Sequence, residues 1–275
     1  MSETLITMGI ERRITFVIGQ GGFASWKLNR LKTLSGFFRS VVILQNITTG
    51  EKANTEHVLK VISLGIQQNA LCQLRIEGSD AELACMVLTD FVADQFDIVN
   101  TAHKRNPTHC DLMIEQHPAF HLPCHVEYVF ESISVNAEVS KEDMLSKLSR
   151  IVSVTHQETI NDALLKREAV SSTYIGHRIA LPHIMIKEIN LPTLVVFKLN
   201  KAINWGQSAH EVSLIIALFI PAPPTIEVVK VCTKTTRSLL NSNNCHLLTS
   251  STQPEAIKAI LFHFMARDMP SLTWD

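Results

Sequence analysis

The groups best suited to chemistry lie in residues 164–186, where one imidazole follows a proline and one arginine lies 16 residues earlier. The imidazole is His183, directly after Pro182, and the arginine is Arg167. Proline fixes its own φ and biases the preceding Leu181 toward extended backbone, so the position of the ring is well specified. Imidazole is a competent nucleophile near neutral pH, and a guanidinium binds phosphoryl oxygens without losing its charge. A helix-end Arg167 and a strand-end His183 can therefore converge on one anion, and this favours acceptance of a phosphoryl group.

The elements that must position this pair alternate between helix and strand. The pattern predicts helices over 140–151, 158–168, 223–240 and from 251 to the last apolar turn, and strands over 178–181, 193–199 and 212–220. The strand at 212–220 is apolar throughout, which is typical of a central strand covered on both faces. The sequence therefore predicts an α/β sandwich around a mixed sheet.

In isolation, a histidine after a proline and an upstream arginine also fit a hydrated loop and a solvated helix end. The longer string is more specific. An Arg-Glu helix end, a Ser-Ser-Thr cluster, a glycine and an Ile-Ala-Leu-Pro-His strand follow one another, and Ile203-Asn204-Trp205-Gly206 comes later. Over about 130–266 this order resembles the enzyme IIA domains of the mannitol/fructose class in the phosphoenolpyruvate-dependent sugar phosphotransferase system (PTS).

The resemblance implies a mechanism. The histidine matched by His183 takes a phosphoryl group from phospho-HPr and passes it to a cysteine of a IIB component of a fructose- or mannitol-like permease. The arginine matched by Arg167 helps to hold the phosphate. Such a transfer needs in-line positioning and charge neutralisation, so no nucleotide, other cofactor or metal is expected.

One position departs from the family pattern. Where a second histidine is usual, at the start of the helix after the central strand, this chain has Thr225. A hydroxyl can donate a hydrogen bond to phosphate but supplies no positive charge. His183 is then expected to accept phosphate more slowly, or to hold it for a different time. His177 and Arg178 are either a compensating pair or solvated loop residues.

The first 98 residues form a second pattern, in the order βαββαβα, with a glycine-rich turn before the first helix. This resembles the phosphocarrier HPr, a small open-faced sandwich. The resemblance fails at the phosphorylated histidine, whose position falls on Phe23 or Ala24, and the arginine two residues later is replaced by Ser25 or Trp26. Our hypothesis is that this module transfers no phosphate and instead serves as a docking or sensing surface, with Phe23 and Trp26 in place of the reactive loop.

A length of 275 residues suits two modest domains, which we place at 1–98 (HPr-like) and 130–270 (IIA-like), joined by a linker at 99–129. The linker holds five histidines, two cysteines and three prolines, and its spacing fits no compact zinc motif, so an extended connector is favoured over a metal site. The fold class expected is α/β (α+β), with an HPr-like sandwich followed by a mixed-sheet α/β/α sandwich.

Charge and hydropathy narrow the function further. The net charge is −1 and the sequence pI is near 6.9, so no basic surface points to nucleic acid or an anionic membrane. The longest apolar run, at 214–220, is too short to span a bilayer, and the beginning of the chain shows no signal-peptide pattern, so a cytoplasmic location is expected. Six scattered cysteines favour reduced thiols. Two functions remain open: a phosphoryl carrier between phospho-HPr and a IIB component, or a phosphorylation-dependent regulator that docks a transporter, an enzyme or a transcription factor.

Overall fold

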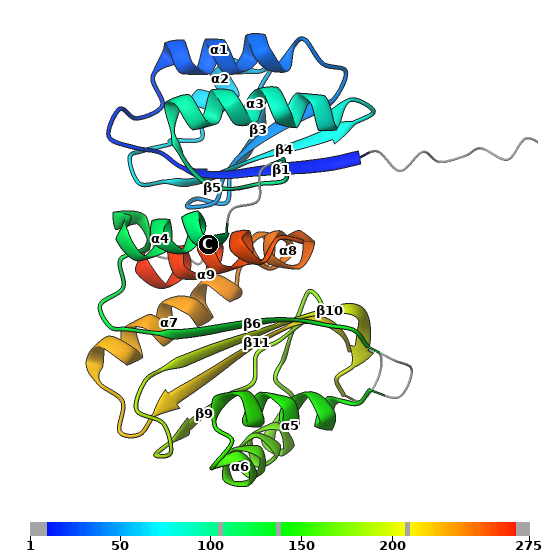
Figure 1. Ribbon diagram of the computed structural model, residues 1–275, viewed down its shortest axis with the longest axis vertical. Coiled ribbons are helices and arrows are strands. Elements are labelled where there is room, and N and C mark those ends of the chain that lie inside the picture. The colour runs from blue at the N-terminus through cyan, green and yellow to red at the C-terminus, as the bar shows by residue number, and fades with distance from the viewer. Residues whose placement is uncertain (1–9, 104–106, 136–138, 207–209, 268–275) are drawn as a thin grey trace, which may run out of the picture. The chain divides into compact units, whose positions relative to one another are not determined.

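The computed structural model describes residues 10–103, 107–135, 139–206 and 210–267. These residues form two compact units (Figure 1). Unit 1 takes the chain up to His121 and then Thr252–Arg267, and unit 2 takes Leu122–Ser251. The chain therefore leaves unit 1, builds unit 2 and returns to unit 1 for its last described helix.

Unit 1 is built on an antiparallel sheet in the order β3-β2-β4-β1-β5. Its strands are β1 (Ile10–Val17), β2 (Val41–Asn46), β3 (Lys52–Asn54), β4 (Leu71–Gly78) and β5 (Asp97–Thr101). Its first three helices are α1 (Ser25–Ser35), α2 (Val58–Ile62) and α3 (Ala81–Gln95). The predicted βαββαβα order is present, and β5 adds a strand to it.

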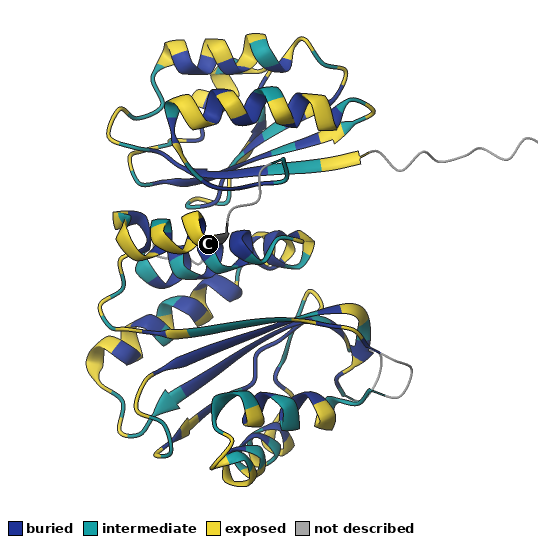
Figure 2. Ribbon diagram, in the orientation of Figure 1, coloured by how far each residue is buried: buried dark blue, intermediate teal, exposed yellow. Residues whose placement is uncertain are grey.

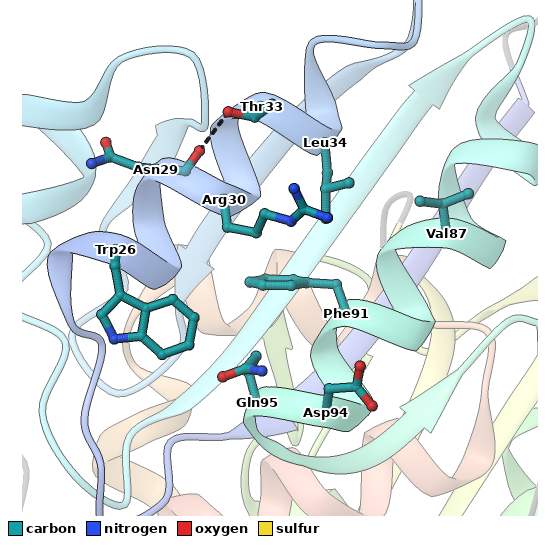
Figure 3. Close-up of a pocket in the computed structure, with 9 residues that line it drawn as sticks. All are labelled: Trp26, Asn29, Arg30, Thr33, Leu34, Val87, Phe91, Asp94 and Gln95. Atoms are coloured by element: carbon teal, nitrogen blue, oxygen red, sulfur yellow. Dashed lines mark hydrogen bonds between the residues drawn. The ribbon is translucent and has the colours of Figure 1, made fainter.

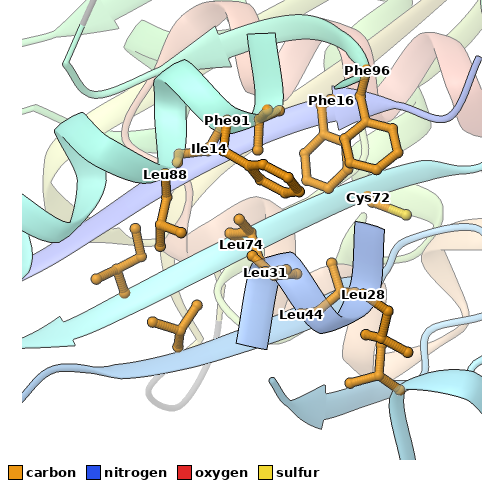
Figure 4. Packing of buried hydrophobic residues seen from close by; sticks show 14 of the residues in the cluster. Ile14, Phe16, Leu28, Leu31, Leu44, Cys72, Leu74, Leu88, Phe91 and Phe96 are labelled. Carbon is orange, nitrogen blue, oxygen red and sulfur yellow. The ribbon is translucent and has the colours of Figure 1, made fainter. Parts of the chain in front are cut away.

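The core of unit 1 lies between the sheet and the helices α1 and α3 (Figure 4). Alternate residues of β1, Ile14 and Phe16, are fully buried there, as are Leu28 and Leu31 from α1 and Leu88 from α3. Their spacing follows the period of two in the strand and of three to four in the helices. Removing this apolar surface from water is the main favourable contribution to the folding free energy of unit 1.

The second face of the same sheet is also covered. The polar side chains of Thr15, Gln73 and Asn100 are buried, and Gln73 Nε2 donates to Thr15 Oγ1 at 2.9 Å. The covering elements are α4 (Pro107–Gln116), the 3-10 helix η1 (Pro118–Phe120) and α9 (Pro254–Ala266), which contact one another, and of which α4 and α9 contact β5 (Figure 1). Hence the HPr-like sheet has helices on both faces.

The segment 99–129 therefore differs from the extended linker that the sequence predicts. Two of its three prolines begin helices, because proline lacks the N–H that a helix start leaves unsatisfied and has a helical φ. Pro107 starts α4 and Pro118 starts η1, where the Nδ1 of His117 accepts the Ala119 amide as an N-cap. Residues 252–267, expected within the domain 130–270, group with unit 1.

Unit 2 contains a mixed six-stranded sheet in the order β6-β10-β11-β8-β7, with β9 paired to β11. Its strands are β6 (Glu127–Ile133), β7 (Tyr174–Gly176), β8 (Ile179–Ala180), β9 (His183–Ile186), β10 (Thr193–Asn204) and β11 (Glu211–Pro221). Its helices are α5 (Lys141–Val152), α6 (Gln157–Val170), α7 (Ile226–Leu239) and α8 (Ser242–Ser250). β10 and β11 are antiparallel, as are β7 and β8, whereas β6 runs parallel to β10 and both β8 and β9 run parallel to β11.

The predicted central strand is β11, which is buried along most of its length (Figure 2). The predicted strand at 178–181 is shorter in the structure, where β8 covers only Ile179–Ala180, and a separate strand, β9, begins at His183 after Pro182. The fold class predicted from the sequence, an HPr-like α/β sandwich followed by a mixed-sheet α/β sandwich, is confirmed, but the first sandwich is not open-faced because α4 and α9 cover its second face. Within the described ranges, none of the helices is both long enough and apolar enough to cross a bilayer.

Candidate functional site

Arg167 lies in the last turn of α6 and is half-buried. The helix ends three residues later, and the chain turns back through Ser171. Nη1 of Arg167 donates to the carbonyl of Ser171 at 3.0 Å and to its hydroxyl at 3.1 Å. Both bonds use Nη1, so they hold the guanidinium and leave Nε and Nη2 for other partners.

His183 is the first residue of β9, where it pairs with Leu218 of β11. The carbonyl of Pro182 accepts the Leu218 amide at 2.9 Å, which anchors the backbone just before the ring. Nδ1 of His183 lies 2.9 Å from the carbonyl oxygen of Leu181. A carbonyl can only accept, so Nδ1 carries the proton and Nε2 carries the free lone pair.

The structure brings Arg167 and His183 together through that lone pair. Nε and Nη2 of Arg167 each lie 3.2 Å from Nε2 of His183, so the guanidinium points two donors at the one nitrogen that is free to react. His183 is half-buried, which leaves the ring open to an incoming group. The arrangement suits an anion that arrives at Nε2, because the same two donors can transfer to its oxygens.

Thr225 is the N-cap of α7. Its hydroxyl accepts the Val228 amide at 3.4 Å. Hydrogen bonds from the Glu227 backbone amide and from the Thr225 hydroxyl lower the pKa of the Glu227 carboxyl. Within the described residues, the hydrogen bonds of His183 go to Arg167 and Leu181 and not to Thr225.

The compensating pair considered from the sequence lies elsewhere. His177 and Arg178 form the two-residue turn between β7 and β8, both with positive φ. The His177 ring stacks edge-to-face on His246 at 4.7 Å between centroids, and Arg178 lies 3.8 Å from a carboxylate oxygen of Glu211. Their recorded partners are thus in α8 and β11 rather than at His183.

The Leu181 carbonyl and the Ser171 contacts escape sequence reasoning because a backbone acceptor has no sequence signature of its own. Pro182 is the nearest signal, since it restricts Leu181 to extended backbone. The hydrogen bond from Nε1 of Trp205 to the hydroxyl of Thr173, at 3.1 Å, also escapes it, because the sequence order alone does not pair these two residues.

In unit 1, the loop before α1 holds no imidazole. Phe23 packs inward, with its ring edge-to-face on Phe96 at 5.3 Å, and Ala24 is an N-cap without a side-chain bond. The buried Lys27 donates from Nζ to the carbonyl of Gln95 at 3.2 Å and lies over the Phe96 ring at 4.8 Å. Of the two residues that the docking hypothesis invokes, Phe23 therefore packs against the core.

Trp26 is the other residue, and it remains 58% exposed. It lines a shallow groove of about 580 Å³ between α1 and α3 (Figure 3). Arg30 and Leu34 from α1 and Phe91 and Asp94 from α3 lie around the same groove. The groove thus combines an exposed indole with one charge of each sign.

The described residues contain no cluster of three or more histidine, cysteine or acidic side chains that could hold a metal ion. In the segment 99–129, which the sequence predicts as a linker, Nε2 of His117 lies 3.6 Å from a carboxylate oxygen of Asp97. Burial raises the pKa of Cys110 to about 12 and that of Cys245 to about 11, which keeps these thiols protonated and unreactive.

Comparison with known proteins agrees with both sequence resemblances. Residues 130–263 match the family model "Phosphoenolpyruvate-dependent sugar phosphotransferase system, EIIA 2", and residues 29–94 match "PTS HPr component phosphorylation site". A curated relative, multiphosphoryl transfer protein 1 of Escherichia coli (strain K12), is 27% identical over 106 residues, which is 38% of this chain and 13% of the relative. The chain thus matches only a small part of that relative's length.

Two solved structures resemble parts of the chain. The nitrogen regulatory protein IIA-Ntr from Neisseria meningitidis aligns with a TM-score of 0.41 and 20% identity, over 55% of this chain and 99% of its own. The phosphocarrier protein HPr from Bacillus anthracis str. Ames aligns with a TM-score of 0.26 and 20% identity, over 30% of this chain and 95% of its own.

Together the two family models cover most of both sequence patterns. The HPr match lies in the first sheet and its helices, and the EIIA 2 match contains most of the second sheet. The chain belongs to the phosphoenolpyruvate-dependent sugar phosphotransferase system, as a protein that joins an HPr-like domain to a domain of the EIIA 2 family.

Proposed function

We propose that this protein is a cytoplasmic phosphoryl carrier that accepts phosphate on Nε2 of His183 from phospho-HPr and passes it to a IIB component of a fructose- or mannitol-like permease. The observation that supports this most strongly is the free lone pair of Nε2, which lies 3.2 Å from two donors of Arg167. The nucleophile and the group that neutralises phosphate are thereby in place together.

The transfer needs no net proton movement at His183. The Nε2 lone pair forms the new N–P bond while the N–P bond of the donor phosphohistidine breaks and its electron pair returns to the donor imidazole. The proton stays on Nδ1 of His183 throughout, in its hydrogen bond to the Leu181 carbonyl. As the phosphoryl group arrives, the hydrogen bonds that Nε and Nη2 of Arg167 donate to Nε2 of His183 shift to the phosphoryl oxygens. These oxygens are the better acceptors because they carry more negative charge.

Exposed apolar side chains beside the pair support a protein donor and acceptor. Met185 lies two residues after His183 in β9, so both side chains point to the same face of the strand, and it is 55% exposed. Val170, three residues after Arg167 at the end of α6, is 82% exposed. Because α6 contacts β9, a partner that reaches His183 can bury both.

We assign Thr225 a lesser part at the usual second-histidine position. Its hydroxyl is engaged with Val228 and Glu227, and it brings no positive charge. Arg167 then carries most of the charge neutralisation at phosphorylated His183, and transfer is slower than with a second imidazole.

A second function, as a regulator, is supported by the loop before α1. Phe23 and Ala24 cannot carry phosphate, and the exposed Trp26 lines the groove of Figure 3. In this alternative the HPr-like domain docks a regulated protein, and the charge of phosphorylated His183 changes the affinity.

One experiment separates the two functions. The protein is incubated with labelled phosphoenolpyruvate, enzyme I and HPr, and candidate IIB domains are then added. Label that reaches His183 and moves on to IIB supports the carrier. Label that stays on His183 supports the regulator, and an equally labelled His183→Ala variant rules out this site for both.

A further inference from the structure

Thr173 connects the element that carries Arg167 to the strand that carries His183. It follows α6 in the Ser-Ser-Thr cluster and is 4% exposed. Its carbonyl accepts a hydrogen bond from the Leu181 amide at 2.9 Å, and the Leu181 carbonyl in turn accepts a hydrogen bond from Nδ1 of His183. The residue that sets the imidazole tautomer is therefore anchored on Thr173.

The other polar groups of Thr173 go to the arginine side of the site. Its amide and its hydroxyl both donate to Oε2 of Glu168, at 3.1 and 2.6 Å. Glu168 is the neighbour of Arg167 in α6, so these bonds tie the end of that helix to the loop. That loop also carries Ser171, whose carbonyl and hydroxyl orient the guanidinium.

A third element locks the hydroxyl in place. Nε1 of Trp205, the residue after β10, donates to Oγ1 of Thr173 at 3.1 Å, and Trp205 is fully buried. Because the hydroxyl donates a hydrogen bond to Glu168 and accepts one from Trp205, its orientation is fixed. Three elements thus converge on a single oxygen.

The buried carboxylate of Glu168 carries a desolvation free energy that an apolar side chain of the same size would not carry. It is 8% exposed, and its Oε1 lies 3.7 Å from Nζ of Lys141. Desolvating a carboxylate and an ammonium is often not repaid by their attraction, and apolar residues of similar size commonly serve stability as well. A buried charge directly beside the reactive pair favours a role in specifying geometry.

We propose that Thr173, held by Glu168 and Trp205, is a positioning residue for phosphoryl acceptance: it keeps the proton of His183 on Nδ1 through Leu181 and keeps Arg167 aimed at Nε2. The proposal rests on phosphate acceptance by His183. Because Glu168, Thr173 and Trp205 are all buried, we expect the network to act on the rate of transfer and not on binding of phospho-HPr.

The test uses Thr173→Val in the full-length protein, which removes the hydroxyl and keeps shape and backbone. Thr235→Val is the matched control, because Thr235 is equally buried in the same unit and its hydroxyl donates only to the Val231 carbonyl within α7. Thr173→Ser is the rescue variant, since it restores the hydroxyl. If Thr173→Val does not fold, Trp205→Phe, which removes the indole donor, is judged by the same criteria.

Two readouts are taken. The first is the tautomer of unphosphorylated His183, from imidazole nitrogen shifts in NMR, with the proton on Nδ1 in the wild type. The second is the rate of phosphate acceptance against the concentration of phospho-HPr. Thr173→Val is expected to give a mixture of tautomers and about a tenfold lower maximal rate at unchanged KM, the effect of one lost hydrogen bond. Thr173→Ser and Thr235→Val are expected to keep the wild-type tautomer and rate.

A Thr173→Val protein with the wild-type tautomer and rate, destabilised only as much as Thr235→Val, would overturn the proposal. The tautomer is measured on the unphosphorylated protein. This measurement therefore tests the positioning role even if His183 never accepts phosphate. A wild type whose Nδ1 is protonated but which phospho-HPr never labels would refute the proposed function and leave the positioning network standing.

Discussion

The buried histidine of α9 makes the stability of unit 1 depend on pH in a way that can be calculated. His263 is 1% exposed, with Nε2 2.9 Å from Oγ1 of Thr48 and Nδ1 3.0 Å from the carbonyl of Ala119. Burial, with a contribution from the positive charge of Arg267, lowers the pKa of His263 to about 3. The folded unit therefore excludes a proton that the unfolded chain binds below about pH 6.5.

Because the unfolded state binds more protons over this range, its stability relative to the folded state rises as the pH falls. His263 contributes its full stabilisation above about pH 6.5 and loses about 1.4 kcal/mol for each unit below it, until the folded pKa is reached. Between pH 6 and pH 4 the free energy of unfolding of unit 1 should fall by about 2–3 kcal/mol through this residue alone.

The comparison is with His263→Gln, which keeps a donor and an acceptor but does not titrate, and with His57→Gln, which changes an exposed histidine of α2's N-cap. Hydrogen exchange read by mass spectrometry on peptides of α9 and η1 gives the opening free energy of this region at each pH. The wild type and His57→Gln should share the steep dependence, and His263→Gln should be flatter by the amount above. Parallel curves for all three proteins would refute the reasoning.

Three further predictions follow from single contacts. Arg167→Ala should lower the rate of His183 phosphorylation by about 10- to 100-fold, because it removes both the charge and the two donors. Arg167→Lys should lower the rate by less, because lysine keeps the charge but not the two-donor fork. Quench-flow labelling measures both rates, and a wild-type rate for Arg167→Lys would contradict the role of the fork. Gly78→Ala should destabilise unit 1 by about 1–3 kcal/mol, since a Cβ there would lie 2.6 Å from the Ser40 Cα; urea unfolding that matches the wild type would contradict it. Val170→Asp should raise the KM for phospho-HPr several-fold with little change in maximal rate, because it puts a charge beside the contact surface; an unchanged KM would remove Val170 from that surface.

The alternation of strands and helices could be predicted from the sequence because local periodicity fixes it. The βαββαβα order of unit 1 and the buried strand β11 follow from apolar spacing. The helices of the segment 99–129 could not, because prolines and histidines indicate an extended chain unless the proline occupies a helix start. The apolar spacing of α9 predicts a helix, but a periodic face does not say which sheet it will cover, and α9 groups with unit 1.

The site divides in the same way. Residue types and order indicate Arg167 and His183, because nucleophile and anion-binding groups have distinctive side chains. The tautomer of His183 depends on a backbone carbonyl, and the orientation of Arg167 depends on a turn, so neither has a sequence signature. Phe23 illustrates the converse. Its place in a loop suggested a surface role, whereas packing against Phe96 turns it inward.

The most direct test of the central claim is to identify the phosphorylated atom. The protein, labelled with nitrogen-15 in histidine and phosphorylated through enzyme I and HPr, is examined by NMR for nitrogen–phosphorus coupling, with His183→Ala to assign the signal. The account predicts a single phosphohistidine with phosphorus on Nε2 of His183 and a proton retained on Nδ1. Phosphorus on Nδ1, or on any other residue, would contradict it.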